Sequence, residues 1–526
     1  MIICQRFWLK KNKFKQIPST FRARRDFSMV YLRVMNQLNR FWIIGLILLL
    51  SCGQPPESKK EKDGAALVET YCSGCHLPVK PEQLDKETWL KHVLPAMAPK
   101  LGIPTTAGGQ YYIVANSQEK SALSFEEWTK LVDYFEKTAP DSLKATAREP
   151  LKKDWSIFQL QKPKEFPEHS LTTMVHFQGD KIYSGHNGQA TLYAWDKNLN
   201  RSEVVTLQSP VVHAEFTSPT EAAVTTIGTL LAVDQPIGDV VKVDVVTKKT
   251  SLIASQLPRP IQSMPGDFNK DGRTDWIICG FGHDKGGLYL STQQADGSYQ
   301  TNPIRPEAGA TQVVVDDFNK DGWPDCMALF AHGDEGLWLF TNNKKGGFEE
   351  KRIQRFLPLA GSTSFQLVDL NKDGQLDLVY TSGDNSDYSK ILKPYHGVYT
   401  FINQGNFNFK QNWFYPINGC TKVIAADFDQ DGDIDLATIA FFADFKNNPD
   451  ESFIYFEQND QKQFVPHAIP VHVNGRWICM DVKDWDGDGD LDIVLGNYSR
   501  GFNNQEDYKP NWNLNLPLIV LKNRTK

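Results

Sequence analysis

A nine-residue acidic motif occurs five times in the second half of this chain. The copies are DFNKDGRTD from Asp267, DFNKDGWPD from Asp317, DLNKDGQLD from Asp369, DFDQDGDID from Asp427 and DWDGDGDLD from Asp484. Successive copies start 50, 52, 58 and 57 residues apart. A nearly fixed period of this length is typical of repeat arrays such as propeller blades.

The residues around each motif predict four short β-strands per repeat. An apolar strand such as 311–315 leads into the motif, and a second such as 491–495 follows it. An alternating aromatic strand such as 336–340 and a short final strand such as 351–353 complete the unit. Two earlier units without the motif, at 172–207 and 211–257, bring the expected number of blades to seven. The last unit lacks its fourth strand, so we expect residues 155–160 to supply it and close the ring.

The spacing within the motif predicts a calcium-binding loop. Oxygens at positions 1, 3, 5 and 9 can converge on one ion, as at the start of an EF-hand loop, and glycine at position 6 permits the sharp turn. Hard carboxylate and amide oxygens suit Ca²⁺. No glutamate stands at position 12, so these are not EF-hands, and the alternative is a set of Asp-Gly turns without metal. The predicted ligands of up to five ions are Asp267, Asn269, Asp271 and Asp275; Asp317, Asn319, Asp321 and Asp325; Asp369, Asn371, Asp373 and Asp377; Asp427, Asp429, Asp431 and Asp435; and Asp484, Asp486, Asp488 and Asp492.

These runs closely resemble FG-GAP/VCBS repeats, the calcium-loop blades also found in the propellers of integrin α-subunits. The resemblance is strong over residues 267–526 and weak over 156–266. It implies an all-β propeller, which we place at residues 155–526.

The net charge of the chain is consistent with bound cations. The formal net charge is −6, and residues 1–51 hold ten basic residues and one acidic residue, so the remainder carries −15. No basic stripe indicates a nucleic-acid partner.

A second motif lies in the first part of the chain. Tyr71 is followed by Cys72, Ser73, Gly74, Cys75 and His76, which gives the Cys-x-x-Cys-His attachment signature of a c-type haem. Two thiols at this spacing can each form a thioether, and the histidine can then bind the iron. The alternatives are half of a zinc site or a redox dithiol. A zinc site needs a second ligand pair, which residues 53–150 do not offer, and no βαβ pattern accompanies the motif.

The residues after this motif resemble a small cytochrome c domain, which we place at 64–140 as an all-α fold. Residues 84–94 predict a middle helix and 124–135 a closing helix, with a capping box at Ser124 and Glu127 and an apolar stripe at helical spacing. Met97 is the predicted sixth iron ligand, and His92 is the rival. Residues 141–154 would form a linker to the propeller.

The N-terminal region predicts export. An uncharged apolar run at 41–50 has the length of a signal-peptide core and is too short to span a bilayer as a helix. It ends in Leu49-Leu50-Ser51-Cys52-Gly53, which resembles a bacterial lipoprotein box and implies a lipid on Cys52 after cleavage; the alternative is a plain secretory signal. We expect residues 1–52 to be the signal and 53–63 a polar tether. This places the chain in the bacterial cell envelope, facing the periplasm or the cell surface.

The remaining cysteines and one set of loops complete the prediction. Cys279, Cys326, Cys420 and Cys479 lie in apolar strands, so we expect buried free thiols rather than disulfides.

The loops between second and third strands would gather on the rim opposite the motifs, as a candidate binding surface or as ordinary polar loops. They carry His186, His283, Asp284, Lys285, His332, Asp334, Asp384, Asp387, Asp444, Lys446, Asn497 and Arg500.

Three functions are compatible with these features. The first is an electron carrier with covalent haem c, a redox partner protein and the propeller as scaffold or docking platform. The second is an oxidoreductase that binds a substrate on the propeller, as quinoprotein dehydrogenases do, although no nucleophile motif or acid/base pair indicates an enzyme. The third is a calcium-dependent adhesion or glycan-binding lipoprotein. Fold alone does not decide among them, and the haem signature favours the first because it alone has defined chemistry.

Overall fold

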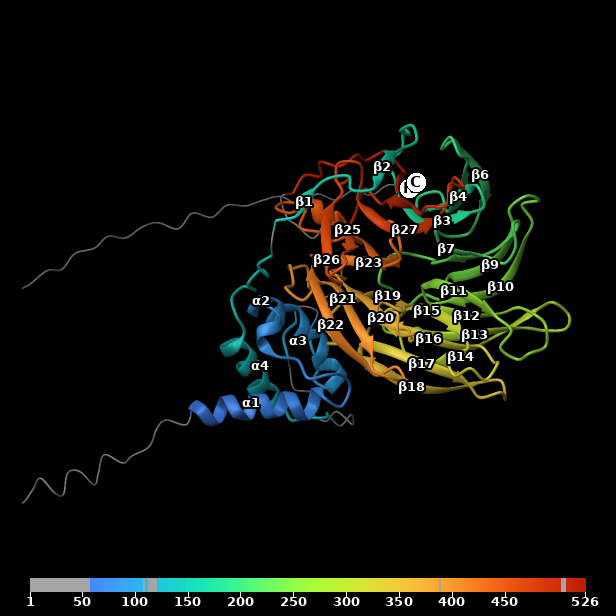
Figure 1. The fold of residues 1–526 in the computed structure, drawn as a ribbon. Helices are drawn as coiled ribbons and strands as arrows, with labels where there is room; N and C mark the ends of the chain where they lie inside the picture. The colour runs from blue at the N-terminus through green and yellow to red at the C-terminus, as the bar shows by residue number, and fades with distance from the viewer. Residues whose placement is uncertain (1–56, 107–108, 112–120, 149, 387–388, 503–507) are drawn as a thin grey trace, which may run out of the picture. The chain divides into compact units, whose positions relative to one another are not determined.

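Residues 155–526 form seven antiparallel sheets that succeed one another around a ring (Figure 1). The computed structural model describes residues 57–106, 109–111, 121–148, 150–386, 389–502 and 508–526. Blade one contains β3 (Thr172–Gln178), β4 (Lys181–His186), β5 (Thr191–Trp195) and β6 (Arg201–Thr206), and blade two contains β7 (Val211–Phe216), β8 (Glu221–Thr226), β9 (Gly238–Asp244) and β10 (Thr250–Leu257). These two blades match the two predicted units that lack the acidic motif.

The next three blades each follow the same strand order. Blade three contains β11 (Pro260–Gly266), β12 (Asp275–Gly280), β13 (Gly287–Gln293) and β14 (Tyr299–Arg305). Blade four contains β15 (Ala310–Asp316), β16 (Asp325–Phe330), β17 (Gly336–Asn342) and β18 (Phe348–Arg355). Blade five contains β19 (Ser362–Val368), β20 (Asp377–Ser382), β21 (Gly397–Asn403) and β22 (Phe409–Pro416). The acidic motif therefore connects the first strand of each blade to the second.

The last two blades depart from this order at their outer edges. Blade six contains β23 (Cys420–Ala426), β24 (Asp435–Ala440), β25 (Phe453–Gln458) and β26 (Phe464–Ala468), with the 3₁₀ turn η4 (Pro449–Ser452) before β25. A two-residue strand, β1 (Lys152–Lys153), adds to β26 in parallel, inside the segment predicted to be a linker. Blade seven contains β27 (Trp477–Lys483), β28 (Asp492–Asn497) and β29 (Leu518–Asn523).

The ring closes as the sequence predicts. The strand β2 (Phe158–Gln161) pairs antiparallel with β29 and becomes the fourth strand of blade seven, with Phe158 opposite Asn523. A segment from the start of the propeller thus completes its last blade, which covers an edge that would otherwise expose unpaired backbone groups.

Side chains link each blade to the next one around the ring. Gln366 is an example. Its side-chain amide accepts from Ala425 N at 2.8 Å and donates to Ala425 O at 2.9 Å, so it pairs with both backbone polar groups of Ala425. Bonds from innermost strands join five further pairs of neighbouring blades: Thr173 to Val211, Gln262 to Val313, Gln312 to Phe365, Lys422 to Met480 and Asp481 to Phe177. Blades two and three are joined by Thr225 of the second strand β8, whose hydroxyl bonds that of Ser263. The exposed edge of each inner strand is therefore partly satisfied by the preceding or following blade.

The apolar core lies between adjacent blades. Every residue of the second strands β12, β16, β20, β24 and β28 is buried, whereas the fourth strands β14, β18 and β22 are mostly exposed or half-buried. Cys279, Cys326 and Cys420 are buried free thiols, which confirms that expectation, and Cys479 is a half-buried free thiol.

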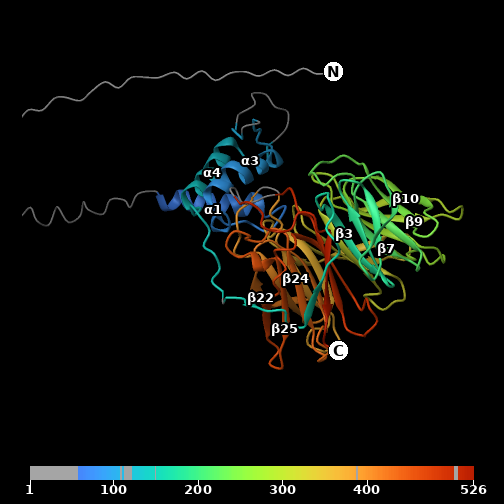
Figure 2. The same ribbon diagram turned by 90° about the horizontal axis from the view of Figure 1, so that it is seen from above.

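The described part of the first 150 residues is helical (Figure 2). It contains α1 (Glu57–Cys72), η1 (Pro81–Gln83), α2 (Lys86–Thr88), the π-helical turn η2 (Trp89–Val93), α3 (Leu94–Met97), η3 (Ala98–Leu101) and α4 (Phe125–Thr138). The predicted middle helix begins two residues later than expected and continues to Leu101. The helix α1 starts inside the segment predicted to be a tether. None of the described helices has the length and apolarity needed to cross a bilayer.

The closing helix α4 follows its sequence signals. Ser124 Oγ accepts from Glu127 N at 3.1 Å, and Glu127 Oε2 accepts from Ser124 N at 2.8 Å, so the predicted capping box is present. Its Trp128, Leu131 and Phe135 are buried in one apolar cluster with Val68 of α1. The helices α1 and α4 also approach closely at Gly64, where a Cβ atom would lie 2.3 Å from Tyr134 Cβ. A side chain at position 64 would push the two helices apart.

Candidate calcium loops, haem-attachment motif and rim pocket

The five acidic loops share one backbone geometry. Glycine at position 6 has a positive φ in each, from 81° at Gly272 to 94° at Gly489, a conformation that side chains disfavour. The aspartate at position 1 accepts the backbone N–H of this glycine, as Asp267 Oδ2 does from Gly272 N at 2.9 Å and Asp317 Oδ2 from Gly322 N at 2.7 Å. The sequence therefore correctly predicts the sharp turn at the glycine of position 6. The aspartate side chain at position 1 points into this turn.

The aspartate at position 9 has a structural role in every loop that the spacing alone does not reveal. It is the first residue of the second strand, it is fully buried, and its carboxylate accepts one N–H from the loop and one from the end of the third strand. These two donors are Phe268 and Gln293 for Asp275, Asn319 and Asn342 for Asp325, Leu370 and Asn403 for Asp377, Phe428 and Gln458 for Asp435, and Trp485 and Asn523 for Asp492. We call these five residues the clamp aspartates.

Burial raises the pKa of all five clamp aspartates, to about 7 for Asp435 and about 6 for Asp492. Each carboxylate oxygen keeps a second lone pair after it accepts one N–H, except Asp435 Oδ2, which also accepts from Tyr455 O–H at 2.8 Å. The third-strand partners are all Asn or Gln, and two of their amides also reach the neighbouring blade. Asn342 Nδ2 donates to Phe268 O at 2.8 Å and Asn523 Nδ2 to Phe428 O at 2.7 Å. The recurrence of Asn or Gln at the end of each aromatic strand is the sequence signal for this contact.

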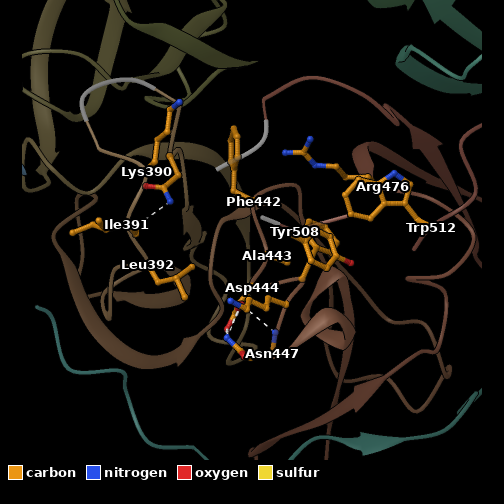
Figure 3. A pocket seen from close by; sticks show the side chains of 13 residues that line it. Lys390, Ile391, Leu392, Phe442, Ala443, Asp444, Asn447, Arg476, Tyr508 and Trp512 are labelled. Atoms are coloured by element: carbon orange, nitrogen blue, oxygen red, sulfur yellow. Dashed lines mark hydrogen bonds between the residues drawn. The ribbon is translucent and has the colours of Figure 1, made fainter. Parts of the chain in front are cut away.

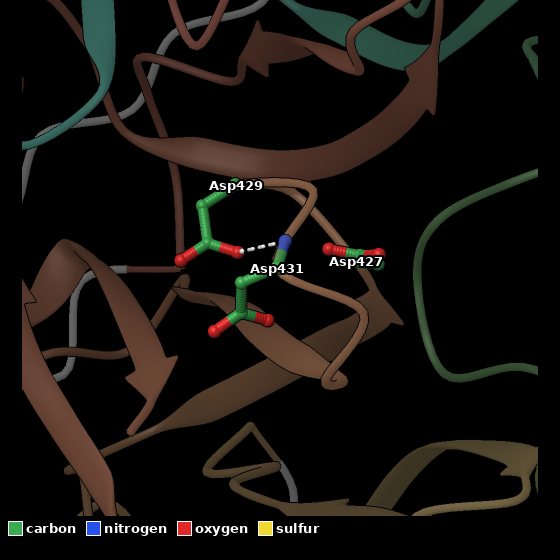
Figure 4. A group of neighbouring side chains, drawn as sticks. All are labelled: Asp427, Asp429 and Asp431. Atoms are coloured by element: carbon green, nitrogen blue, oxygen red, sulfur yellow. Dashed lines mark hydrogen bonds between the residues drawn. The ribbon is translucent and has the colours of Figure 1, made fainter. Parts of the chain in front are cut away.

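The loop of blade six offers the best cation site (Figure 4). One carboxylate oxygen from each of Asp427, Asp429 and Asp431 lies within 4.8 Å of the others. Asp427 Oδ1 is buried and has no hydrogen-bond donor among the described residues. Three carboxylates this close repel one another, and a buried acceptor without a donor is unfavourable, unless a cation lies between them. Oxygen ligands of this kind fit Ca²⁺.

In each of the other four loops, a lysine, arginine or asparagine side chain lies beside an acidic oxygen at position 3 or 5. In blade seven, oxygens of Asp484, Asp486 and Asp488 also lie within 4.8 Å of one another, but Lys522 pairs with Asp486 and lies 3.5 Å from Asp488. Lys344 lies 3.0 Å from Asp321 in blade four, and Arg273 pairs with Asp271 in blade three. In blade five, Asn371 Nδ2 donates to Asp373 Oδ2 at 3.0 Å, as do Asn269 and Asn319 to their own position-5 aspartates. These loops hold the predicted residues together and place internal donors beside them.

The Cys-x-x-Cys-His motif lies at the C-terminal end of α1. Cys75 N and His76 N both donate to Cys72 O at 3.2 Å, so the motif forms a tight turn. His76 Nδ1 lies 2.8 Å from Leu77 O, which can only accept, so Nδ1 carries the proton and Nε2 keeps its lone pair. A histidine oriented through Nδ1 in this way is the usual form of a metal ligand.

Cys72 does not resemble the attacking thiol of a redox dithiol. Burial raises the pKa of Cys72 to about 11, whereas reactive thiols have lowered pKa values. Among the described residues, only the two aspartate clusters bring three acidic, histidine or cysteine ligands together, so the described part of the chain gives no second half to a zinc site at Cys72 and Cys75.

Met97 belongs to the same apolar cluster as Cys72, and His92 is exposed. The cluster also contains two buried polar groups, Tyr111 O–H and Trp128 Nε1–H, which have no partner among the described residues. The Cys72 thiol, the Met97 thioether and these two donors lie at one apolar cluster, a set of groups that fits a covalently attached haem, whose edge carries carboxylates that accept hydrogen bonds. The predicted lipidation site Cys52 and the apolar run at 41–50 lie outside the described residues.

The rim opposite the acidic loops contains a pocket of about 340 Å³ (Figure 3). Blades five, six and seven line it, and of the predicted rim residues it includes Asp444 and Lys446. His186 and Asn497 are instead buried within blades one and seven, and Asp334 pairs with Arg352 and Arg355. Asp387 lies outside the described residues. Sequence reasoning missed the pocket residues Phe442, Arg476, Tyr508 and Trp512, for which it gave no signal.

A comparison with protein families agrees with the repeats in this fold. Residues 267–328 and 317–380 match the model of the FG-GAP-like repeat. The chain is 28% identical over 189 residues to the T-cell immunomodulatory protein homolog of Plasmodium falciparum, a match that covers 33% of this chain and 25% of that protein. The chain thus spans about a quarter of that relative's length. The crystal structure of virginiamycin B lyase from Staphylococcus aureus aligns with 69% of this chain and 98% of its own, at 10% identity and a TM-score of 0.45. The seven sheets and the matched repeats together define this protein as a seven-bladed β-propeller that contains FG-GAP-like repeats.

Proposed function

We propose that this protein is a c-type haem electron-transfer lipoprotein of the bacterial envelope, whose calcium-stabilised propeller serves as a scaffold and binding platform. The observation that supports it most is the end of α1, where two thiols precede a histidine with Nε2 left for a metal; Cys72 and, from α3, Met97 pack against one apolar cluster. A haem held there would accept and donate single electrons, which calls for a redox partner protein.

The residues of the helical part would have distinct roles toward that haem. Cys72 and Cys75 would fix it covalently, and His76 would bind the iron through Nε2. Tyr111 and Trp128 would donate hydrogen bonds to its carboxylates, which would satisfy their buried polar atoms. The surrounding apolar side chains would exclude water, and lower polarity around an iron centre tunes its reduction potential.

Replacing Met97 by alanine tests the sixth ligand. We expect the absorption band typical of His/Met ligation to disappear and the reduction potential to fall, because the thioether ligand raises the potential. Absorption and redox titration of the oxidised protein measure both effects. His92→Ala is the matched control and should leave the band unchanged. A band that persists in Met97→Ala and is lost in His92→Ala would assign the ligand to His92.

Calcium removal tests the propeller loops. An ion that binds only the native state stabilises it by about 2.7 kcal/mol per site when its free concentration is 100 times Kd. We therefore expect a chelator to lower the Tm and added Ca²⁺ to restore it in a concentration-dependent way. Mg²⁺ at equal concentration should restore less, because it requires a smaller and more rigid site. A Tm that does not respond to chelation would contradict structural calcium.

Replacing Cys52 by serine tests the lipid anchor. We expect the variant to leave the membrane fraction and appear in the soluble envelope fraction, because the lipid would be its stable attachment. Fractionation of cells followed by immunoblotting measures this. Membrane association that survives the substitution would show another attachment.

The rim pocket favours binding of a ligand as a second function of the propeller. It combines aromatic, amide and charged side chains, as small-molecule sites do. This observation supports the glycan-binding alternative. The electron-transfer and binding roles are compatible in one protein.

A further inference from the structure

We propose that the rim pocket on blades five, six and seven binds the carboxylate-bearing sugar of an acidic glycan, a uronic acid residue, with Arg476 as the group that recognises the carboxylate. This names the ligand class of the proposed binding platform and rests on that part of the proposed function. It is independent of the haem, so the two proposals can fail separately.

Arg476 is a buried cation that lacks a carboxylate partner among the described residues. Its side chain is 2% exposed, and it donates to three backbone carbonyls: Nε to Phe441 O at 2.9 Å, Nη1 to Gly501 O at 2.6 Å and Nη2 to Phe502 O at 2.9 Å. A guanidinium has five N–H groups, so Nη1 and Nη2 each retain one. A buried charge without a counter-ion is unfavourable. A planar carboxylate that accepts from both nitrogens would supply the missing charge.

The guanidinium is held by rings as well as by carbonyls. Its central carbon lies 3.8 Å from the centroid of Phe441 and 5.7 Å from that of Phe442. Figure 3 shows the side chain of Arg476 extending toward Phe442, with Tyr508 and Trp512 below it. This fixed orientation means that little flexibility is lost when an anion binds.

The walls of the pocket distinguish a sugar acid from a purely apolar acid. Phe442, Tyr508 and Trp512 provide flat apolar surfaces on one side, and Asp444 and Asn447 provide polar atoms on another. A uronic acid has apolar C–H faces, hydroxyl groups around its edge and one carboxylate, which matches these three kinds of surface. The volume of about 340 Å³ lies at the small end of the range for ligand pockets and suits one or two sugar rings.

The charge of the lining also favours an anion. Among the described lining residues, Lys390, Lys446 and Arg476 are cationic and Asp444 is anionic. This local excess contrasts with a chain whose formal net charge is −6. A positive pocket in an acidic protein attracts anionic ligands and repels cationic ones.

Calorimetric titration of the calcium-loaded full-length protein with trigalacturonate tests the proposal. Methyl-esterified trigalacturonate is the matched probe, since it keeps the rings and removes the charges. We expect the ester to bind at least about tenfold more weakly, because hydrogen bonds to a charged group are among the strongest in proteins. Arg476→Lys keeps the positive charge but loses the paired N–H donors of the guanidinium. It should therefore weaken the binding of trigalacturonate about tenfold or more and change the binding of the ester little.

Variants at the edge of the pocket keep the test valid if Arg476→Lys does not fold. Lys390 is exposed, and Lys390→Glu should weaken trigalacturonate about threefold to tenfold, with a larger effect at low salt. Lys351→Glu on the exposed strand β18 is the matched charge reversal and should change nothing. Equal affinity for the acid and its ester, equal effects of Lys390→Glu and Lys351→Glu, or no binding of trigalacturonate would each overturn the proposal.

Discussion

Replacing Asp435 by alanine is expected to lower the free energy of unfolding by about 2 to 5 kcal/mol, since each buried donor left without an acceptor costs about 1 to 3 kcal/mol. Three donors would lose their acceptor: Phe428 N at 3.2 Å, Gln458 N at 2.8 Å and Tyr455 O–H at 2.8 Å. The buried carboxylate is itself costly, as its raised pKa of about 7 indicates, which offsets a part of the loss. Denaturant titration in the presence and absence of calcium measures the effect.

A comparison of Asp431→Ala with Asp435→Ala, both in blade six, distinguishes loss of the bound ion from loss of the hydrogen bonds of the clamp aspartate. Asp431→Ala removes an exposed carboxylate of the acidic cluster, so it should destabilise the protein in calcium and have little effect in a chelator. Asp435→Ala should destabilise it under both conditions. Asp460→Ala, at an exposed position after β25, should stay within about 0.5 kcal/mol of the parent. If Asp435→Ala is destabilising only in calcium, position 9 acts as an ion ligand alone.

Replacing Cys72 and Cys75 together by serine is expected to abolish covalent haem completely, because serine forms no thioether. The change should remove the haem absorbance that stays with the polypeptide after denaturation. The full-length protein, expressed in a host that attaches haem to exported cytochromes, provides the sample. Either single substitution should leave one thioether and a reduced yield of holoprotein.

The matched control for this pair is a cysteine of the propeller. Cys420 is a fully buried free thiol of β23, so Cys420→Ala removes a thiol without touching the motif. It should keep the haem and lose at most a modest amount of stability. Covalent haem in the double serine variant would place the attachment elsewhere.

Much of the fold is contained in local sequence signals. The acidic motif fixes a turn through its glycine, and its period places one such turn in each of five blades. The capping box of Ser124 and the apolar stripe after it determine α4. Even the long-range pairing of β2 with β29 could be predicted, because the last repeat is one strand short and an unpaired edge is unfavourable.

The roles of individual site residues could not be predicted, because they depend on which atoms lie next to each other in the folded chain. The spacing of the acidic residues gives all four ligand positions the same apparent role, yet Asp435 is used by backbone donors and Asp427 Oδ1 has none. The rim pocket combines residues far apart in the sequence, such as Lys390, Arg476 and Trp512, from three blades. An arginine just before a strand is usually exposed to solvent. The sequence does not indicate that Arg476 is buried, because its burial depends on packing against Phe441.

The most direct test of the proposed function is the intact mass and the oxidised and reduced absorption spectra of the protein matured in a host with haem-attachment machinery. The proposal predicts one haem added to the polypeptide mass, and a haem spectrum that changes on reduction and stays with the chain after denaturation. A colourless protein with the unmodified mass would contradict the electron-transfer function and leave a propeller whose proposed role is binding.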